Sequence, residues 1–209
     1  MTIPPPTIGA ILAGGLARRM GGGDKAMLGV GGRTVLTRLI GRLSPQVRRT
    51  VLNANGDPGR FAGLGLAVVA DSLPAHPGPL AGILAALEWA AAEASEYEWV
   101  VTVPCDTPFL PTDLAERLHA ARLRDGAVLA CAASAGQTHP VIALWPVKLA
   151  APLRRAVQED GLRKVGRFTG LYPCAIAEWG TNPVDPFFNV NTAEDLTEAE
   201  RLAKAYPDM

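Results

Sequence analysis

Short apolar runs alternate with segments of helical spacing along this chain, and this alternation restricts the possible folds more than any other feature of the sequence. Strands separated by helices form strand–helix–strand units, which build a mainly parallel sheet with right-handed crossovers. We therefore predict an α/β fold with a mainly parallel sheet. The expected strands are Ile8–Ala13, Thr50–Asn55, Ala67–Ala70, Trp99–Val103, Ala127–Ala132 and Val141–Leu144, and the expected helices are Thr34–Leu43, Pro79–Ser95, a helix from Thr112 to a basic end at Arg122 and Arg124, Val147–Gln158 and Ala193–Ala205.

The length and the placement of breaker residues favour one folding unit. A chain of 209 residues is long enough for one well-packed domain. Segments rich in glycine and proline fall between the expected elements, and the sequence has no internal repeat and no low-complexity linker. We expect a single domain over residues 1–209.

Composition and charge exclude several classes of protein. Hydrophobic residues make up 48% and charged residues 19%, which is typical of a globular chain. The 20 basic and 20 acidic residues balance, so net charge indicates neither a nucleic-acid nor a membrane partner. The three cysteines show no CxxC spacing, which favours neither a disulfide framework nor a zinc site and suits a reducing compartment. With no basic leader and no apolar run of about 20 residues, the sequence predicts a soluble cytoplasmic protein.

Polar residues follow several of the expected strands. In an open α/β sheet, ligands bind at the carboxyl ends of the strands, near the point where the strand order reverses. That rule selects the loop after Ala13, the side chains of Asn53 and Asn55, and the carboxylates of Asp71 and Asp106. We expect these groups to lie near one ligand.

The segment ILAGGLARRMGGGDKAML, residues 11–28, combines bare backbone with positive charge. Glycines let backbone N–H groups approach an anion closely, and Arg18, Arg19 and Lys25 can reach phosphate oxygens. The loop therefore predicts a triphosphate or a similar polyanion. The alternative is a glycine-rich hairpin with solvated arginines.

Two common nucleotide motifs do not fit this loop. A Walker A motif needs glycine before its lysine and serine or threonine after it, whereas Lys25 follows Asp24 and precedes Ala26. The dinucleotide-binding pattern G-x-G-x-x-G fits no position in the loop. The loop is therefore of neither kind.

The segment VVTVPCDTPFLP places Asp106 directly after a buried strand. A hard cation such as Mg²⁺ prefers oxygen ligands and keeps several waters, so Asp106 is a candidate to bridge that ion to phosphate. The alternative is a turn-forming aspartate ahead of Pro108. The glycine loop and this aspartate together favour the functional interpretation.

The glycine loop resembles the L-A-G-G-x-x-x-R-M-G-x-D-K signature of nucleotidyltransferases, and specifically of the molybdenum cofactor guanylyltransferase family. The segments VLNAN, VVADSLPAHPGPLAGIL, PCDTPFLP, HPVIAL and FFNVNTAEDL resemble further blocks of that family in the same order, from about Ile8 to Leu196. The resemblance implies a Rossmann-like three-layer sandwich of the nucleotide-diphospho-sugar transferase type.

The resemblance also implies a reaction. The family joins the guanylate of GTP to the terminal phosphate of molybdopterin, with Mg²⁺, and releases pyrophosphate. By analogy, Arg19 would neutralise the leaving pyrophosphate, Lys25 would hold the α-phosphate region, and Asp106 would carry Mg²⁺ and touch the nucleotide. No nucleophilic side chain is required, because the acceptor phosphate is already an anion. The GTP preference follows from the resemblance alone.

The same analogy assigns the binding residues. Leu12, Ala13, Gly14 and Gly15 would contact the nucleotide through the backbone, with Asn53 and Asp71 near the base and ribose; Gly78, Pro79 and Gly82 (in PGPLAG) and Asn189 and Asn191 (in FNVNT) would contact molybdopterin. Other interpretations stay open. PGPLAG also suits an ordinary turn before a helix, and the two asparagines suit N-capping of the last helix together with Thr192. His76 and His139, each followed by proline, are interpreted as structural.

Partners and alternatives complete the hypothesis. The resemblance implies GTP and molybdopterin, or its molybdenum form, as substrates, and molybdopterin-donating and molybdoenzyme-maturation proteins as partners of a monomer. One alternative is a cytidylyltransferase or a sugar-1-phosphate nucleotidylyltransferase on the same fold. Another is a non-catalytic nucleotide-binding module that delivers a cofactor.

Overall fold

The protein is described by a computed structural model, which covers residues 5–14, 25–73 and 78–208. Its main sheet consists of β1 (Thr7–Leu12), β4 (Arg49–Asn53), β5 (Ala67–Val69), β6 (Trp99–Pro104), β7 (Leu129–Ser134), β8 (Gln137–Pro146) and β9 (Cys174–Trp179). The α-helices are α1 (Val35–Leu43), α2 (Pro79–Glu93), α3 (Leu114–Arg124), α4 (Ala150–Gln158), α5 (Val165–Thr169) and α6 (Ala193–Ala205). The remaining elements are the paired strands β2 (Gly29–Val30) and β3 (Arg33–Thr34) and the 3₁₀ turns η2 (Lys25–Met27), η3 (Ser44–Gln46), η4 (Pro58–Leu64) and η5 (Val147–Leu149).

The seven-stranded sheet has the order β5-β4-β1-β6-β8-β7-β9 and is mainly parallel, as predicted. β5, β4, β1 and β6 pair in parallel, and so do β7 and β9. β8 runs antiparallel to both of its neighbours, β6 and β7. The sheet thus has one reversed strand, β8, in its interior.

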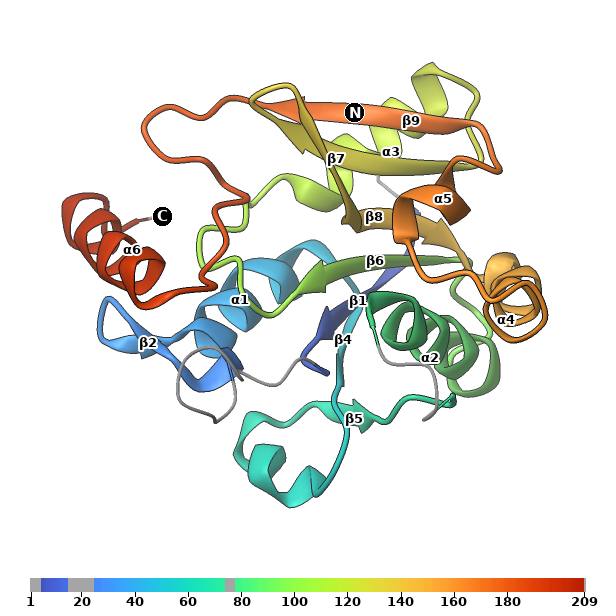
Figure 1. Ribbon diagram of the computed structural model, residues 1–209, viewed down its shortest axis with the longest axis horizontal. Coiled ribbons are helices and arrows are strands. Elements are labelled where there is room, and N and C mark those ends of the chain that lie inside the picture. Colours follow the sequence, from blue (N-terminus) through green and yellow to red (C-terminus); the bar gives the residue numbers. More distant parts are fainter. Residues whose placement is uncertain (1–4, 15–24, 74–77, 209) are drawn as a thin grey trace.

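Helices cover both faces of this sheet and give the three layers seen in Figure 1. Apolar residues of α1, α3 and α6 form one core with one face of the sheet, and those of α2, α4 and α5 form a second core with the other face. All six residues of β1 are buried, because it lies in the middle of the sheet between these layers. α1 crosses β1 closely: a Cβ added at Gly9 would lie 2.9 Å from the Leu43 side chain.

The order in which the strands are added across the sheet reverses next to β1. From β1 it passes to β4 and then to β5 on one side, and it returns to β6 on the other side of β1. The carboxyl ends of β1 and β6 therefore flank the crevice in which open α/β sheets bind ligands.

The β7–β8 hairpin is the main difference from the expected elements. β8 begins at Gln137 rather than Val141, and a two-residue turn at Ala135 and Gly136 joins it to β7. Both turn residues have positive φ, 50° and 72°, as the hairpin turns that match strand twist require. A non-glycine residue is uncommon in that conformation, and the Ala-Gly pair therefore gave no hairpin signal.

β9 and α5 are not among the expected elements. β9 lies at the edge of the sheet, and its sequence CAIAEW alternates buried and exposed residues. Pro173 accepts a hydrogen bond from the Leu129 N–H (3.4 Å), so in a parallel ladder the carbonyls of Ile176 and Glu178 face away from β7. Arg124 of α3 donates to the Ile176 carbonyl (3.4 Å), and Arg117 donates to that of Glu178.

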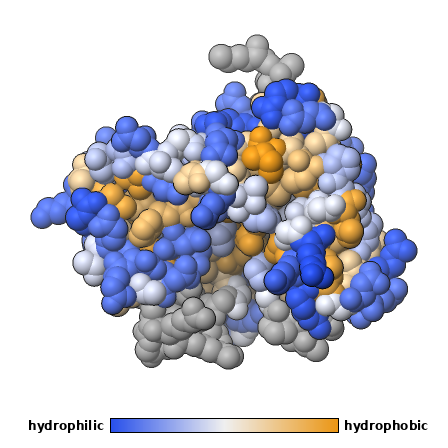
Figure 2. Space-filling view, turned by 45° about the horizontal axis from the view of Figure 1, so that its top comes forward, coloured by the Kyte–Doolittle hydropathy of each residue, from blue (hydrophilic) through white to orange (hydrophobic). Residues whose placement is uncertain are grey.

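The surface of the molecule is mixed in polarity. Figure 2 shows a largely hydrophilic face with hydrophobic residues visible around a hollow near its middle. In the part of the chain that the structure covers, no helix combines the length and the apolar character needed to cross a lipid bilayer.

Candidate active site

Four strands end at the same level at one edge of the sheet. Leu12 is paired with Asn53 of β4 and with Pro104 of β6, and Asn53 is paired with Val69 of β5. The pairing extends into the loops: Ala13 donates to the Asn53 carbonyl (2.7 Å) and Cys105 to the Leu12 carbonyl (3.1 Å). The predicted residues Leu12, Ala13, Asn53 and Asp106 therefore meet at one edge.

A network of amides holds the carboxylate of Asp71. The Asn53 Nδ2 atom donates to Asp71 Oδ1 and the Asn55 Nδ2 atom donates to Asp71 Oδ2, both at 2.8 Å. The Asp71 N–H returns a bond to Asn55 Oδ1 (2.9 Å), and Asn53 Nδ2 also donates to the Val69 carbonyl (3.1 Å). Each carboxylate oxygen keeps further lone pairs, so Asp71 can accept bonds from hydroxyl or amino groups of a ligand.

Two glycines lie against this network from different elements. A Cβ added at Gly14 would lie 3.7 Å from Asn53 Oδ1 and 3.9 Å from Asp71 Oδ2, which is ordinary contact distance. A Cβ added at Gly82, in α2, would lie only 2.4 Å from Asn53 Oδ1. Gly82 is buried, and the Asn53 amide occupies the space that its side chain would need. The structure thus gives Gly82 a packing role against Asn53, whereas sequence reasoning assigned Gly82 to molybdopterin.

Asp106 lies in the turn directly after β6 and is half-buried. The Thr107 hydroxyl closes this turn by donating to the Pro104 carbonyl (3.1 Å). The Asp106 carbonyl accepts a bond from the Val190 N–H (2.8 Å), which joins the turn to the segment before α6. The carboxylate is thus carried by a turn that is fixed on both sides.

Side chains from α1 and η3 hold the loop that follows Asp106. Arg38 donates to the Pro108 carbonyl (3.3 Å), Arg42 to the Leu110 carbonyl and Gln46 to the Pro111 carbonyl (2.8 Å). Burial lowers the pKa of Arg38 and that of Arg42. The charge of Arg33 lowers the pKa of Arg38 further, and the charge of Arg38 lowers that of Arg42.

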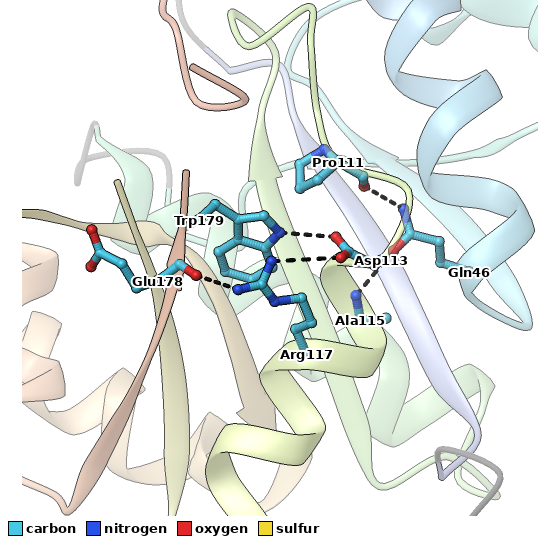
Figure 3. Close-up of polar contacts among 7 residues, drawn as sticks. All are labelled: Gln46, Pro111, Asp113, Ala115, Arg117, Glu178 and Trp179. Carbon is cyan, nitrogen blue, oxygen red and sulfur yellow. Dashed lines mark hydrogen bonds and ion pairs between the residues drawn. The ribbon is translucent and has the colours of Figure 1, made fainter. Parts of the chain in front are cut away.

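The start of α3 is fixed by further contacts, shown in Figure 3. Gln46 Oε1 accepts from the Ala115 N–H (3.0 Å), and Asp113 Oδ1 accepts from Trp179 Nε1 (2.9 Å). The Arg117 guanidinium lies over the Trp179 ring, 4.2 Å from its centroid. These contacts join residues that are far apart in the sequence, so no local pattern indicated them.

The predicted molybdopterin residues fall on two segments. Gly78 and Pro79 are exposed at the start of α2, where Gly78 has a φ of 129°. Asn189 is exposed and Asn191 is half-buried, on either side of the fully buried Val190 that bonds to Asp106. The structure brings the asparagine segment to the Asp106 turn.

The N-cap of α6 is Thr192, and neither asparagine takes that position. Thr192 accepts a bond from the Asp195 N–H (3.1 Å), and Asp195 Oδ2 accepts from the N–H groups of Asn191 and Thr192, both at 2.9 Å. The capping interpretation named the two asparagines together with Thr192, and the structure confirms Thr192 as the cap but not the asparagines. Threonine followed three residues later by an acidic group was the available signal.

Sequence reasoning missed a group of polar residues at the same edge of the sheet. β8 runs antiparallel, so its first residues lie beside the carboxyl end of β7, where Ser134 is. His139 Nε2 lies 2.8 Å from Ser134 Oγ, and Ser134 donates to Asp185 Oδ2 (3.1 Å). Burial lowers the pKa of His139, while Asp185 and Glu178 act to raise it. His139 was noticed from the sequence, but Ser134 and Asp185 had no signal of their own.

Some predicted residues lie outside the described part of the chain. Gly15 and Arg19, together with Arg18, fall within residues 15–24, and His76 falls within 74–77. Lys25 is the first residue of η2. Among the described residues, no group of three or more His, Cys, Asp or Glu side chains gathers as a metal cluster.

The fold and the site together define a class. A mainly parallel sheet, a glycine-rich segment after β1 and a carboxylate after β6, at the point where the strand order reverses, are the features of a nucleotide-binding α/β protein. The comparisons with known proteins narrow this class. Residues 9–172 match the model of the MobA-like NTP transferase domain.

Sequence relatives cover nearly the whole chain. It is 58% identical over 199 residues to the molybdenum cofactor guanylyltransferase of Rhodopseudomonas palustris (strain BisB5), covering 95% of each chain. It is 59% identical over 204 residues to that of Nitrobacter hamburgensis, covering 97% of this chain and 98% of the relative. The chain therefore belongs to the MobA-like NTP transferases and, among them, to the molybdenum cofactor guanylyltransferase family, whose members are nucleotidyltransferases.

A solved structure confirms the predicted fold type. Molybdopterin-guanine dinucleotide biosynthesis protein A from Archaeoglobus fulgidus superposes with a TM-score of 0.72 at 23% identity, covering 95% of this chain and 99% of that one. At that identity the likeness shows the fold, which is that of the nucleotide-diphospho-sugar transferases.

Proposed function

We propose that this protein transfers GMP from GTP to the terminal phosphate of molybdopterin, giving molybdopterin guanine dinucleotide and pyrophosphate. Membership of the guanylyltransferase family supports the reaction. The observation that carries the proposal to this chain is the Asn53–Asp71–Asn55 network beside the end of β1, with the Asp106 turn on the other side of that strand. We propose further that residues 1–209 act as one cytoplasmic domain and as a monomer.

The nucleotide would lie over the end of β1. Backbone groups of Leu12, Ala13 and Gly14 would contact it, because Gly14 leaves this surface without a side chain. Asp71 would bind the base or ribose, with Asn53 near it, since the Asn53 amide fixes the Asp71 carboxylate before any ligand arrives. Gly15, Arg19 and Lys25 are assigned to the phosphates by the family signature alone.

Asp106 would hold the divalent metal, which we propose to be Mg²⁺. The chemistry of the donor fits: a half-buried carboxylate at a fixed turn suits a hard cation. Mg²⁺ is often bound by one or two carboxylates together with substrate phosphates, so a cluster of protein ligands is not required. When bound, the ion would neutralise the charge that develops on the phosphates.

The protein's own residues would align two phosphates. An oxygen of the acceptor phosphate attacks the α-phosphorus of GTP and forms a new P–O bond, while the bond to the bridging oxygen breaks and pyrophosphate leaves. In-line placement and charge stabilisation provide most of the rate in such reactions. Asn189 and Asn191, with the start of α2 at Gly78 and Pro79, would hold the acceptor opposite the nucleotide.

Calorimetry with GTP, CTP, ATP and UTP in the presence of Mg²⁺ is the first test, followed by pyrophosphate release with GTP and molybdopterin. A preference for GTP together with pyrophosphate release would support the proposal. A preference for CTP would overturn the guanylyl assignment. Binding of GTP without any transfer to molybdopterin would favour a non-catalytic nucleotide-binding module.

A further inference from the structure

Three side chains from separate segments form a hydrogen-bonded chain at the carboxyl edge of the sheet. Ser134 ends β7, His139 lies near the start of β8, and Asp185 lies in the segment between β9 and α6. Ser134 is 1% exposed, whereas His139 is half-buried. The buried Ser134 thus joins His139, at the carboxyl edge of the sheet, to the carboxylate of Asp185, which lies 51 residues after Ser134 in the sequence.

The chemistry of the three side chains fixes which atom donates in each of the two hydrogen bonds. An ionised Asp185 carboxylate only accepts, so the Ser134 hydroxyl hydrogen is directed to Oδ2. The Ser134 oxygen can then only accept from His139, so the Nε2 atom of His139 carries the proton. This order differs from that of a nucleophilic triad, in which the serine donates to the histidine. The arrangement is suited to holding position and does not activate the serine.

Asp185 in turn holds the segment 185–190, which carries Asn189 and ends next to Asn191. Its Oδ1 atom accepts from the Phe187 N–H (2.9 Å), and its carbonyl accepts from the Phe188 N–H (3.1 Å). The Phe187 ring packs 5.0 Å from His139 and 5.2 Å from Trp179, centroid to centroid. At the other end, the Val190 N–H bonds to the Asp106 carbonyl (2.8 Å). Residues 185–190 are therefore fixed at both ends.

We propose that the hydrogen-bonded group of His139, Ser134 and Asp185 positions Asn189 for the phosphorylated acceptor and so sets the affinity of the enzyme for that second substrate. The proposal rests on the proposed function above. It makes Ser134, His139 and Asp185 positioning residues, since they act through the segment 185–190. The nucleotide-side residues Asn53 and Asp71 are held by separate contacts, so GTP binding is independent of this group.

The test compares four variants in the full-length protein. Ser134→Ala and His139→Leu break the chain, whereas His139→Gln keeps a nitrogen donor near the Nε2 position. Ser44→Ala is the matched control, because it removes another serine hydroxyl that bonds to a side chain, Thr50 Oγ1 at 2.9 Å, near the start of β4. If Ser134→Ala does not fold, Asp185→Asn replaces it, since it keeps the shape and removes the charge.

The measurements are KM for molybdopterin, kcat, the Kd for GTP and the amide exchange rate of Val190. We expect the two breaking variants to raise KM about tenfold, the effect of losing a hydrogen bond to a charged group. Their kcat and GTP Kd should stay within about twofold of wild type, exchange at Val190 should speed up about tenfold, and His139→Gln should recover most of KM. An unchanged KM, or a parallel loss of kcat and GTP affinity, would overturn the positioning role.

The Val190 measurement separates this inference from the proposed function. If wild-type protein binds GTP but transfers nothing to molybdopterin, the proposed reaction fails while exchange at Val190 still responds to Ser134→Ala. If exchange at Val190 is the same in Ser134→Ala and in wild type, the positioning chain is refuted whatever the enzyme's substrate.

Discussion

Replacing Gly82 by alanine tests whether the Asn53–Asp71 network needs the close approach of α2. The added methyl would lie 2.4 Å from Asn53 Oδ1, well inside the 3.4 Å at which ordinary contact begins. Asn53 is 1% exposed, and its amide donates to both Val69 and Asp71, so it can move away only by weakening those bonds. Weakening two hydrogen bonds costs about 2 kcal/mol, which agrees with the cost of about 1–3 kcal/mol for overpacking of a core, and the two figures describe the same loss.

A smaller effect opposes this loss. Alanine in a helix interior is favoured over glycine by about 0.5–1 kcal/mol. The net loss expected for Gly82→Ala is therefore about 1–2 kcal/mol, which lowers Tm by about 2–8 °C in a protein of this size. Because Asp71 would lose one of its two amide donors, Asn53, we expect the affinity for GTP to fall about tenfold.

Gly41→Ala is the matched control for this prediction. Gly41 lies in α1, is exposed, and has no atom within 4 Å of an added Cβ. It should stabilise the protein by about 0.5–1 kcal/mol and leave GTP binding unchanged. The assays are thermal unfolding and calorimetric titration with GTP. If Gly82→Ala behaves like Gly41→Ala in both assays, the proposed link between α2 and the nucleotide side of the site is refuted.

Three further predictions address catalysis, core packing and pH. Asp106→Asn should lower metal-dependent pyrophosphate release about 10²–10³-fold without changing Tm, and a wild-type rate would remove Asp106 from the metal role. Thr102→Val keeps the shape of a fully buried side chain but removes its bonds with Trp145 (2.8 Å) and Val141 (2.6 Å), so we expect a loss of about 2 kcal/mol in urea unfolding, and no loss would contradict it. Burial, with a smaller effect of Arg122, lowers the pKa of His119 from 6.5 to about 4. The folded state therefore resists protonation, and the free energy of unfolding should fall by about 3 kcal/mol as pH drops through that interval. His119→Gln should flatten this slope, and parallel curves for the two proteins would refute the assignment.

The parallel strands β1, β4, β5 and β6 could be predicted from the sequence because they are short, continuous apolar runs between helices. β1 and β6 are buried over nearly their whole lengths, so their composition alone indicates a central position. β9 is different: its inward residues include two alanines, which have weak strand preference, and its outward residues are polar or exposed. Such an edge strand is defined by its partner β7, which a sequence does not display.

In the site, too, the residues at strand ends could be predicted from the sequence, whereas those defined by their tertiary partners could not. Asn53, Asp71 and Asp106 could be predicted to lie together because each lies at or after the end of a strand, and the sheet itself brings strand ends together. The position of Gly82 against Asn53 could not be read, because it depends on how α2 packs on β4. Asp185 could not be found either, since its partner Ser134 lies in a different strand and no spacing relates the two.

The bonds from two arginines of α3 to β9 have a consequence for the pairing of this edge with a second molecule. An edge strand with unpaired carbonyls invites a strand from a second molecule. On β9, two outward carbonyls already accept from Arg117 and Arg124 of α3, so an incoming strand would have to displace both side chains before it could pair there. These two side chains of α3 therefore hinder pairing of a second molecule with the sheet at this edge.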